Sequence, residues 1–258
     1  MSSPAELAAE HARTRRRLAV AVADEARRAW RAVDPTRIAE SWIAQMARLL
    51  VLVTGAQRAV AGRADQYLTD ALVAQGLDPE PAAELVPQAL SGVASDGRPL
   101  DSLLYRPVVT ALTGLQRGAP LDRALAGGQA ALDMIVRTQI SDAGRIADQV
   151  AMTARPGATG YVRMLVGRSC SRCAILAGRW YASNAGFDRH PRCRPGATAS
   201  TFPDVRAPSA TSAPTRRSSS PRCRDRSRTA YLPGPALRRS GSELTSARSS
   251  TRAAARSA

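Results

Sequence analysis

The sequence predicts a mainly α fold, in which an N-terminal helical body is followed by a small α+β module of cysteine and histidine residues and a disordered basic tail. Apolar residues make up 44% of the 258 positions and are mostly Ala, Leu and Val, with only 4% aromatic residues. This composition favours helices over a β-sandwich. Larger aliphatic residues become scarce after Cys193. We therefore expect three parts, at residues 1–156, 157–194 and 195–258.

Capping signals and apolar spacing predict the first two helices. Ser3-Pro4-Ala5-Glu6 has the form of a capping box with Pro at the first helical position. We expect Asp34-Pro35 to end the first helix and to cap a second that runs from Thr36. The positions expected to face the core at helical spacing are Leu18, Val22, Ala26, Trp30 and Val33, then Ile38, Trp42, Met46, Leu49 and Val53. The positions expected on the solvated face of the first helix are Arg15, Arg16, Arg27, Arg28 and Arg31.

Weaker helical patterns follow, separated by Pro and Gly. We expect short helices around residues 64–74, 79–92 and 102–115. From Pro120 to about Arg155 the pattern predicts a helical hairpin or one long broken helix, with the break at Gly127-Gly128. Its expected inward positions are Leu121, Leu125, Leu132, Ile135, Ile140, Ile146 and Val150. Tyr161–Val166 alternates and is rich in branched residues, so it predicts a strand.

The charge is strongly positive and of an unusual kind. The net charge is +16, and all 37 basic residues are arginine. A chain without lysine indicates a GC-rich gene, which weakens the inference from basic charge to nucleic-acid binding. The last 64 residues carry 12 arginines against three acids, whereas the preceding part is only mildly basic. The longest apolar stretch, Leu49–Val53, is too short for a bilayer. We expect no membrane partner.

Cysteine and histidine residues gather in one short segment. Cys170-Ser-Arg-Cys173 is followed by His190-Pro-Arg-Cys193. Two such close pairs suit a tetrahedral zinc ion, so Cys170, Cys173, His190 and Cys193 are the predicted metal ligands of a structural zinc site. Two alternatives are a reduced, unmetallated pair of turns and a redox Cys-x-x-Cys. A catalytic zinc would want an open position and a nearby acid, and Asp188 is the one close carboxylate. We therefore expect that the protein is not an enzyme.

The segment from about residue 128 to 193 resembles the phage Mu protein F-like family of minor head proteins. The resemblance is carried by Arg137-Thr138 on a helix, the strand, Cys170 and Cys173, then Leu176, Gly178 and Trp180, and finally His190, Pro191 and Cys193. It implies a structural minor capsid or head-morphogenesis protein of a tailed phage or prophage. It further implies contacts with portal and capsid proteins, with packaged DNA as a further candidate partner. The expected location is the virion, and the host bacterial cytoplasm during assembly.

The chain departs from the family pattern at one position, where Pro195 stands in place of a further cysteine. His190 must then serve as the fourth ligand. The departure coincides with the change in composition, and out-of-frame translation of a GC-rich gene yields such streams of Arg, Ala, Pro and Ser. We interpret residues 195–258 as a frameshifted reading. The alternative is a genuine disordered basic tail that contacts packaged DNA.

Two other functions fit parts of the pattern. A zinc-knuckle nucleic-acid-binding protein would cluster arginines around the cysteines. Arginines do lie there, at Arg168, Arg172, Arg179, Arg189 and Arg192. An HNH-like nuclease would need more histidines than the two in this chain.

Overall fold

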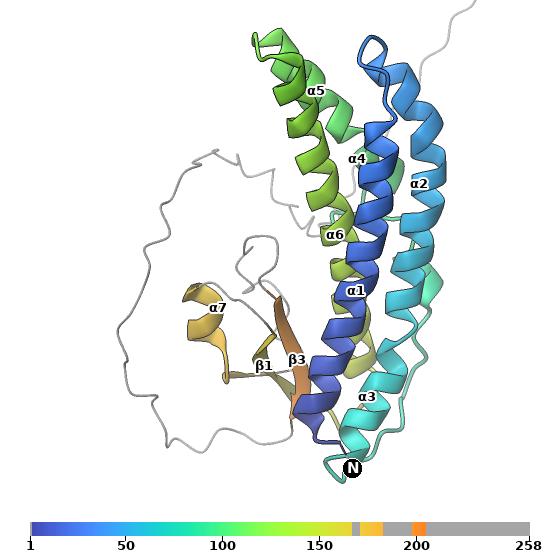
Figure 1. Ribbon diagram of the computed structural model, residues 1–258. Coiled ribbons are helices and arrows are strands. Elements are labelled where there is room, and N and C mark those ends of the chain that lie inside the picture. Colours follow the sequence, from blue (N-terminus) through green and yellow to red (C-terminus); the bar gives the residue numbers. More distant parts are fainter. Residues whose placement is uncertain (1, 167–170, 183–197, 205–258) are drawn as a thin grey trace, which may run out of the picture. The chain divides into compact units, whose positions relative to one another are not determined.

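The computed structural model describes residues 2–166, 171–182 and 198–204, all within one compact unit, Met1–Thr215 (Figure 1). The described part is mainly helical, as predicted. Before Pro156 it contains no strand beyond an isolated bridge between Val93 and Pro99. The helices are α1 (Pro4–Arg31), α2 (Ile38–Ala61), α3 (Ala64–Val73), the 3-10 helix η1 (Pro87–Leu90), α4 (Leu100–Leu104), α5 (Arg106–Gln116), α6 (Leu121–Thr153) and α7 (Ser171–Leu176).

The capping box at the start of α1 is confirmed. The Ser3 hydroxyl accepts a hydrogen bond from the Glu6 backbone N–H, and the Glu6 carboxylate accepts one from the Ser3 backbone N–H at 2.8 Å. The predicted cap of the second helix is wrong, since α2 begins at Ile38 and has no side-chain cap. The Asp34 carboxylate instead accepts a hydrogen bond from the Thr36 N–H at 2.8 Å. This local turn uses up the oxygen that a cap would need.

Two tryptophans form the centre of the larger core. Trp30 and Trp42 are buried, as predicted, and their rings meet edge to face at 5.1 Å. The Trp42 indole N–H donates to the Leu104 carbonyl at 3.0 Å. The predicted break at Gly127-Gly128 is wrong, because α6 runs through both glycines without interruption. Gly128 instead provides the space into which the Trp30 ring packs.

The inward face of α6 changes character along its length. Leu132 and Ile140 are buried, as predicted. Leu121 and Val150 are exposed, which contradicts the prediction for both. In the C-terminal half, alanines take the inward positions, at Ala143, Ala147 and Ala151. Small residues there let α1 and α3 lie close to α6. The larger Val150 therefore lies on the outer face of the helix.

The helix predicted around residues 79–92 is also wrong. Only the four residues of η1 are helical there. Pro79, Pro81 and Pro87 fall within nine positions. Each lacks a backbone N–H and restricts the residue before it, so a continuous helix cannot form.

A three-stranded antiparallel sheet follows the helices, in the order β2-β1-β3. Its strands are β1 (Gly160–Val166), β2 (Trp180–Ala182) and β3 (Thr198–Asp204). β1 is the strand predicted from the sequence. β3 lies within residues 195–258, the part that we expected to be a disordered tail. β3 pairs through its backbone along the whole of β1, from Gly160 opposite Asp204 to Val166 opposite Thr198.

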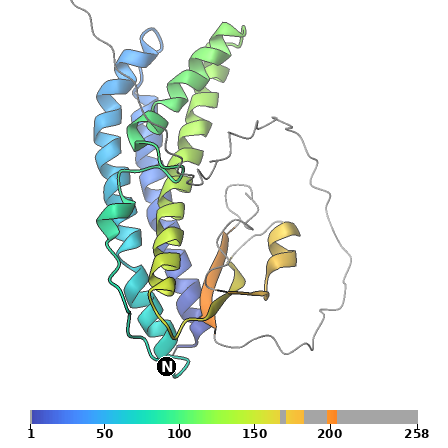
Figure 2. The same ribbon diagram turned by 180° about the vertical axis from the view of Figure 1, so that it is seen from behind.

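A second core cluster joins β1 to the helices. Figure 2 shows the sheet beside the N-terminal end of α1. Tyr161 of β1 is buried together with Leu68 and Leu72 of α3 and with Ala147 and Ala151 of α6. This cluster crosses residue 156, where we expected the helical body to end.

Candidate functional site

One of the four predicted zinc ligands lies within the described residues. Cys173 is in α7, between β1 and β2. Cys170, His190 and Cys193 lie outside the described residues. The side chains are described over residues 2–166 and 174–182, and there no three His, Cys, Asp or Glu side chains are placed to share a metal ion. The zinc site therefore stays a prediction from the sequence.

The turn that follows α7 is bonded to β1. Leu176 ends α7, Gly178 adopts a left-handed backbone conformation with φ of 73°, and Trp180 begins β2. The Gly178 N–H donates to the Arg163 carbonyl at 2.8 Å, which fixes the turn onto the strand. Each residue of the Leu-x-Gly-x-aromatic pattern thus has a distinct structural role.

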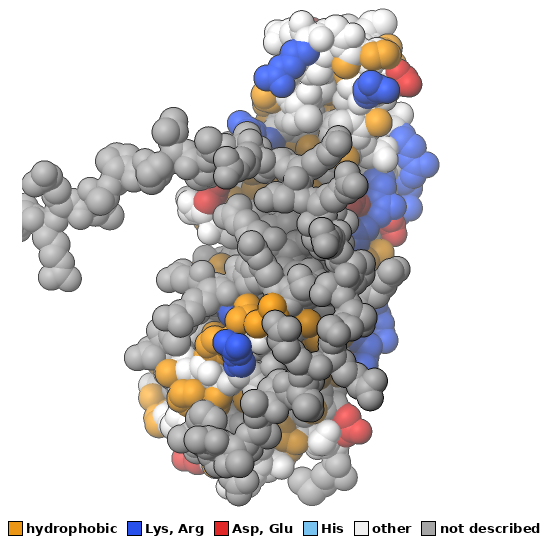
Figure 3. Space-filling model, turned by 90° about the vertical axis from the view of Figure 1, so that its left-hand side faces the viewer, with side chains coloured by type: hydrophobic (Ala, Val, Ile, Leu, Met, Phe, Trp, Pro, Cys, Tyr) orange, Lys and Arg blue, Asp and Glu red, His pale blue; other side chains and the backbone are white. Residues whose placement is uncertain are grey.

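The side chains of β1 and β2 form a stack of rings and one cation. The rings of Tyr161 and Tyr181 stack with centroids 5.3 Å apart, and the buried Arg163 guanidinium lies 4.8 Å from the Tyr181 ring centroid. The Nη2 group of Arg163 and the hydroxyl of Tyr181 are buried without a hydrogen-bond partner in the described structure. Figure 3, which views the molecule from the left of Figure 1, shows hydrophobic and arginine side chains together on that face.

A buried ionic cluster lies where α1, α3 and α6 meet. Asp148 of α6 accepts a hydrogen bond from Arg15 at 2.7 Å and bonds to the His11 ring at 2.8 Å. The Tyr67 ring stacks on His11 at 4.2 Å. Arg15 was expected on the solvated face of the first helix, and that prediction is wrong, since it is only 5% exposed. Gly144 makes room for it, because a Cβ there would lie 2.6 Å from Arg15 Cδ.

The electrostatics of this cluster favour an ionised aspartate. Burial alone would raise the pKa of Asp148, but the neighbouring Arg15 charge and the bonds to His11 and Arg15 hold the pKa below its ordinary value. Burial raises the pKa of Tyr67, and the Asp148 charge raises it further. An Asp–His pair can orient a catalytic base. Through these contacts the cluster joins α1, α3 and α6.

Sequence reasoning missed this cluster, although a signal was present. Ala8, Ala12 and Ala19 of α1 are buried at helical spacing, and Arg15 occupies the position of the same series between Ala12 and Ala19. A charged residue on the apolar stripe of a helix requires a buried partner. The spacing of alanines, which we did not use, would have placed Arg15 inside.

A second arginine fixes the loop after α3. Arg155 is buried and donates to the Asp65 carboxylate at 3.0 Å, to the Pro79 carbonyl at 3.0 Å and to the Ala151 carbonyl at 2.9 Å. These bonds connect α3, the loop and the end of α6. Arg155 therefore holds the loop after α3 against α3 and α6.

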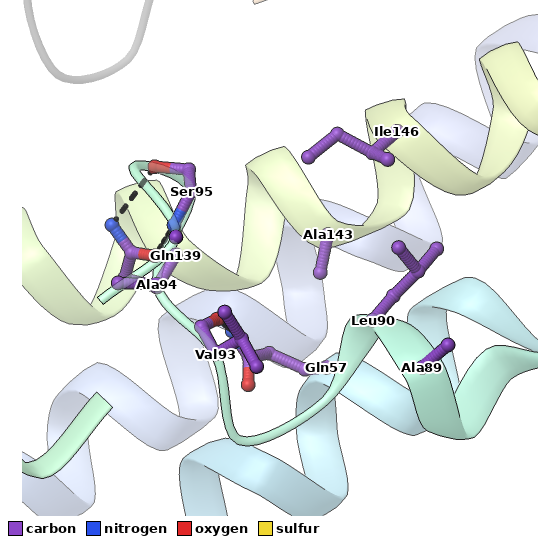
Figure 4. Close-up of a pocket in the computed structure, with 10 residues that line it drawn as sticks. Gln57, Ala89, Leu90, Val93, Ala94, Ser95, Gln139, Ala143 and Ile146 are labelled. Atoms are coloured by element: carbon purple, nitrogen blue, oxygen red, sulfur yellow. Dashed lines mark hydrogen bonds between the residues drawn. The ribbon is translucent and has the colours of Figure 1, made fainter. Parts of the chain in front are cut away.

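A cavity of about 200 Å³ lies beneath the segment that follows η1 (Figure 4). Gln57 of α2 donates to the Val93 carbonyl at 2.9 Å, and Gln139 of α6 accepts from the Ser95 N–H at 2.7 Å. Ala143 and Ile146 form an apolar wall. Both amide side chains thus hold the segment that follows η1 over the cavity.

Comparisons with family models, curated proteins and solved structures found no match for this chain. The resemblance to the Mu F-like family therefore rests on the motif residues alone. Of these, Arg137-Thr138, the strand and the Leu176–Trp180 turn lie in described elements, α6, β1 and the α7–β2 connection.

Proposed function

We propose that this chain is a structural minor capsid or head-morphogenesis protein of a tailed phage or prophage, which contacts the portal and the inner capsid. The observation that carries the proposal is the compact succession of β1, α7, the Gly178 turn and β2. Leu176, Gly178 and Trp180 of the resemblance lie in this unit, in the same order. The chain would be present in the virion, and in the bacterial cytoplasm during assembly.

The proposed role is structural and not enzymatic. The polar groups of the buried helical cluster bond to one another, and those of the cavity bond to the loop above it. Groups committed in this way contribute to the stability of the fold. Contact surfaces, and not a reaction centre, are then what the protein offers to its partners.

We further propose that Cys170, Cys173, His190 and Cys193 hold a structural zinc ion. The Gly178 turn holds the connection between α7 and β2 against β1, and a metal ion would fasten the segments that flank this unit. Zinc bound by four protein ligands stabilises small modules that have little apolar core.

The test is assembly with the capsid proteins encoded beside its gene. The full chain is co-expressed with the neighbouring portal and major capsid proteins, and the particles are separated on a density gradient. We expect the chain to co-sediment with procapsids that contain portal, and to stay at the top of the gradient when the portal is omitted. A chain that stays at the top in both cases contradicts the proposal.

The second candidate is a zinc-knuckle nucleic-acid-binding protein, which the exposed Arg179 at the turn before β2 favours. Binding to a DNA duplex would weaken steeply as salt rises, because phosphate contacts release counterions. Arg179→Ala should reduce that affinity, whereas Arg123→Ala at the start of α6 should leave it unchanged. A chain that binds DNA but does not co-sediment with procapsids would favour this second function over the first.

A further inference from the structure

The outward face of α2 is apolar and uncovered. Val51 is 72% exposed and Ile43 is 56% exposed, with Ala44 and Ala47 exposed between them. α2 lies at the edge of the helical bundle in both Figure 1 and Figure 2. By length and composition alone, the segment Ile38–Val73 is long and apolar enough to cross a membrane. Only 22% of its most apolar window is buried in the fold, so most of these apolar residues are accessible. The inward face of α2 already supplies the core, so this second apolar face requires a separate explanation.

The outward residues of α2 follow the spacing of a helix-pairing seam. Intervals of four and three residues alternate along Glu40, Ala44, Ala47, Val51, Thr54 and Arg58. Such alternation is the pattern by which one helix packs along another. The seam has small residues at its centre, which allow two backbones to approach closely, and a charge of opposite sign at each end.

We propose that α2 pairs with α2 of a second copy of this chain in an antiparallel arrangement. With a two-fold axis at the level of Leu49, Glu40 lies opposite Arg58 of the second copy. Ala47 then lies opposite Val51 of the second copy, so each larger residue meets a small one. The symmetry repeats both contacts.

The charges select this direction over the parallel one. In a parallel pair, Glu40 would face Glu40 and Arg58 would face Arg58, which is repulsive. Both side chains are available, since Arg58 is exposed and forms no ion pair in the described structure. Among the described residues, Glu40 forms an ion pair with Arg37 alone, whose Nη1 lies 3.7 Å from Glu40 Oε2. One helix face makes a small interface, so the dimer is reversible. The pairing is independent of the head-protein proposal.

The first experiment measures the mass of the full chain by sedimentation equilibrium over a range of concentrations. We expect a reversible dimer, which Val51→Glu converts to a monomer because it places two carboxylates at the centre of the seam. Val109→Glu is the matched control, since Val109 is an exposed valine on α5. A monomer at every concentration overturns the proposal, and so does a dimer that Val51→Glu leaves unchanged.

The second experiment tests the direction. Glu40→Arg and Arg58→Glu should each weaken the dimer by about tenfold, because each turns two attractive pairs into repulsive ones. The double variant Glu40→Arg with Arg58→Glu should restore wild-type affinity, and Arg123→Glu should have no effect. Single variants that dimerise as tightly as wild type would indicate parallel pairing and overturn the antiparallel one.

A third experiment tests lipid as the occupant of this face. If the monomer sediments with phosphatidylcholine vesicles and Val51→Glu abolishes this, the face binds lipid, and self-pairing is overturned.

Discussion

The Trp30 ring occupies the position where a side chain at Gly128 would lie. A Cβ at residue 128 would be 2.3 Å from Trp30 Cζ2 and 3.0 Å from the Pro107 carbonyl oxygen. The ring is held on two sides, since its indole N–H donates to the Leu125 carbonyl at 3.0 Å and its edge meets Trp42. It cannot turn away without breaking these contacts.

Gly128→Ala should therefore destabilise the protein, although alanine is the better helix former. The steric overlap costs about 1–3 kcal/mol, which outweighs the gain in helix propensity of about 1 kcal/mol. Gly127→Ala is the matched control, because its nearest neighbour would be Thr110 Cγ2 at 4.0 Å. We expect that control to be stabilising in urea unfolding. Equal effects of the two substitutions would contradict the close packing.

Asp148 should make stability depend on pH in the acid range. Its pKa in the folded state is lowered from 3.8, so its contribution is present above that value and is lost as the pH falls below it. Asp148→Asn should cost about 3–5 kcal/mol at neutral pH, because Arg15 is left buried without a counter-ion. The loss should shrink in acid. Glu10→Gln removes an exposed acid and should leave unfolding at neutral pH nearly unchanged; a similar loss in both variants would refute the role of burial.

Arg155→Ala should loosen the loop after α3. The substitution leaves the Pro79 and Ala151 carbonyls without their donor, at a cost of about 1–3 kcal/mol. Hydrogen exchange should rise in residues 78–82, which thermal unfolding alone would not reveal. Arg13→Ala removes an exposed pair with Glu10 on α1 and serves as the control. Unchanged exchange in the loop would show that Arg155 does not hold it.

Metal analysis tests the predicted ligands directly. The purified chain should contain one zinc ion, and Cys170→Ser or His190→Ala should lower the zinc content and the melting temperature together. Cys223→Ser should change neither, because Cys223 is not part of the predicted set. The predicted site would be contradicted if Cys223→Ser lowered the zinc content. It would also be contradicted if the chain contained no zinc after expression in zinc-supplemented medium.

The reading-frame hypothesis is tested on the gene itself. Translation of the other two frames after the Cys193 codon should restore a Cys-x-Cys pattern and then a segment with ordinary Leu, Val and Ile content. If neither frame is open, residues 195–258 are native. Their net charge of +9 should then produce DNA binding that weakens across a salt series.

The sequence predicted those elements whose stabilising contacts join residues close together in the chain. The capping box at Ser3 and the apolar spacing around Trp30 and Trp42 involve residues one or two turns apart, so the sequence was sufficient for α1 and α2. The role of Gly128 was predicted wrongly because the Trp30 ring, which requires a glycine there, belongs to another helix. The exposure of Val150 likewise depends on how closely α1 and α3 approach α6, which no single segment encodes.

The candidate site was predictable to a smaller degree. The alternation over Tyr161–Val166 predicted β1, but α7 and β2 were not predicted individually. The cluster around Asp148 was not predicted, because residues 11 and 15 meet residue 148 only after α1 and α6 have packed. β3 was not predicted because its partner, β1, supplies the pairing that its own composition does not indicate.

The central position of β1 has a consequence for synthesis. β2 covers three residues of one edge of β1, whereas β3 covers all seven of the other. Until residues 198–204 leave the ribosome, that second edge exposes a row of unpaired backbone N–H and carbonyl groups, which can recruit a strand from a neighbouring nascent chain. A chain that stopped at Cys193 would keep this edge open permanently. It should collect in inclusion bodies under conditions in which a chain ending at Asp204 stays dispersed.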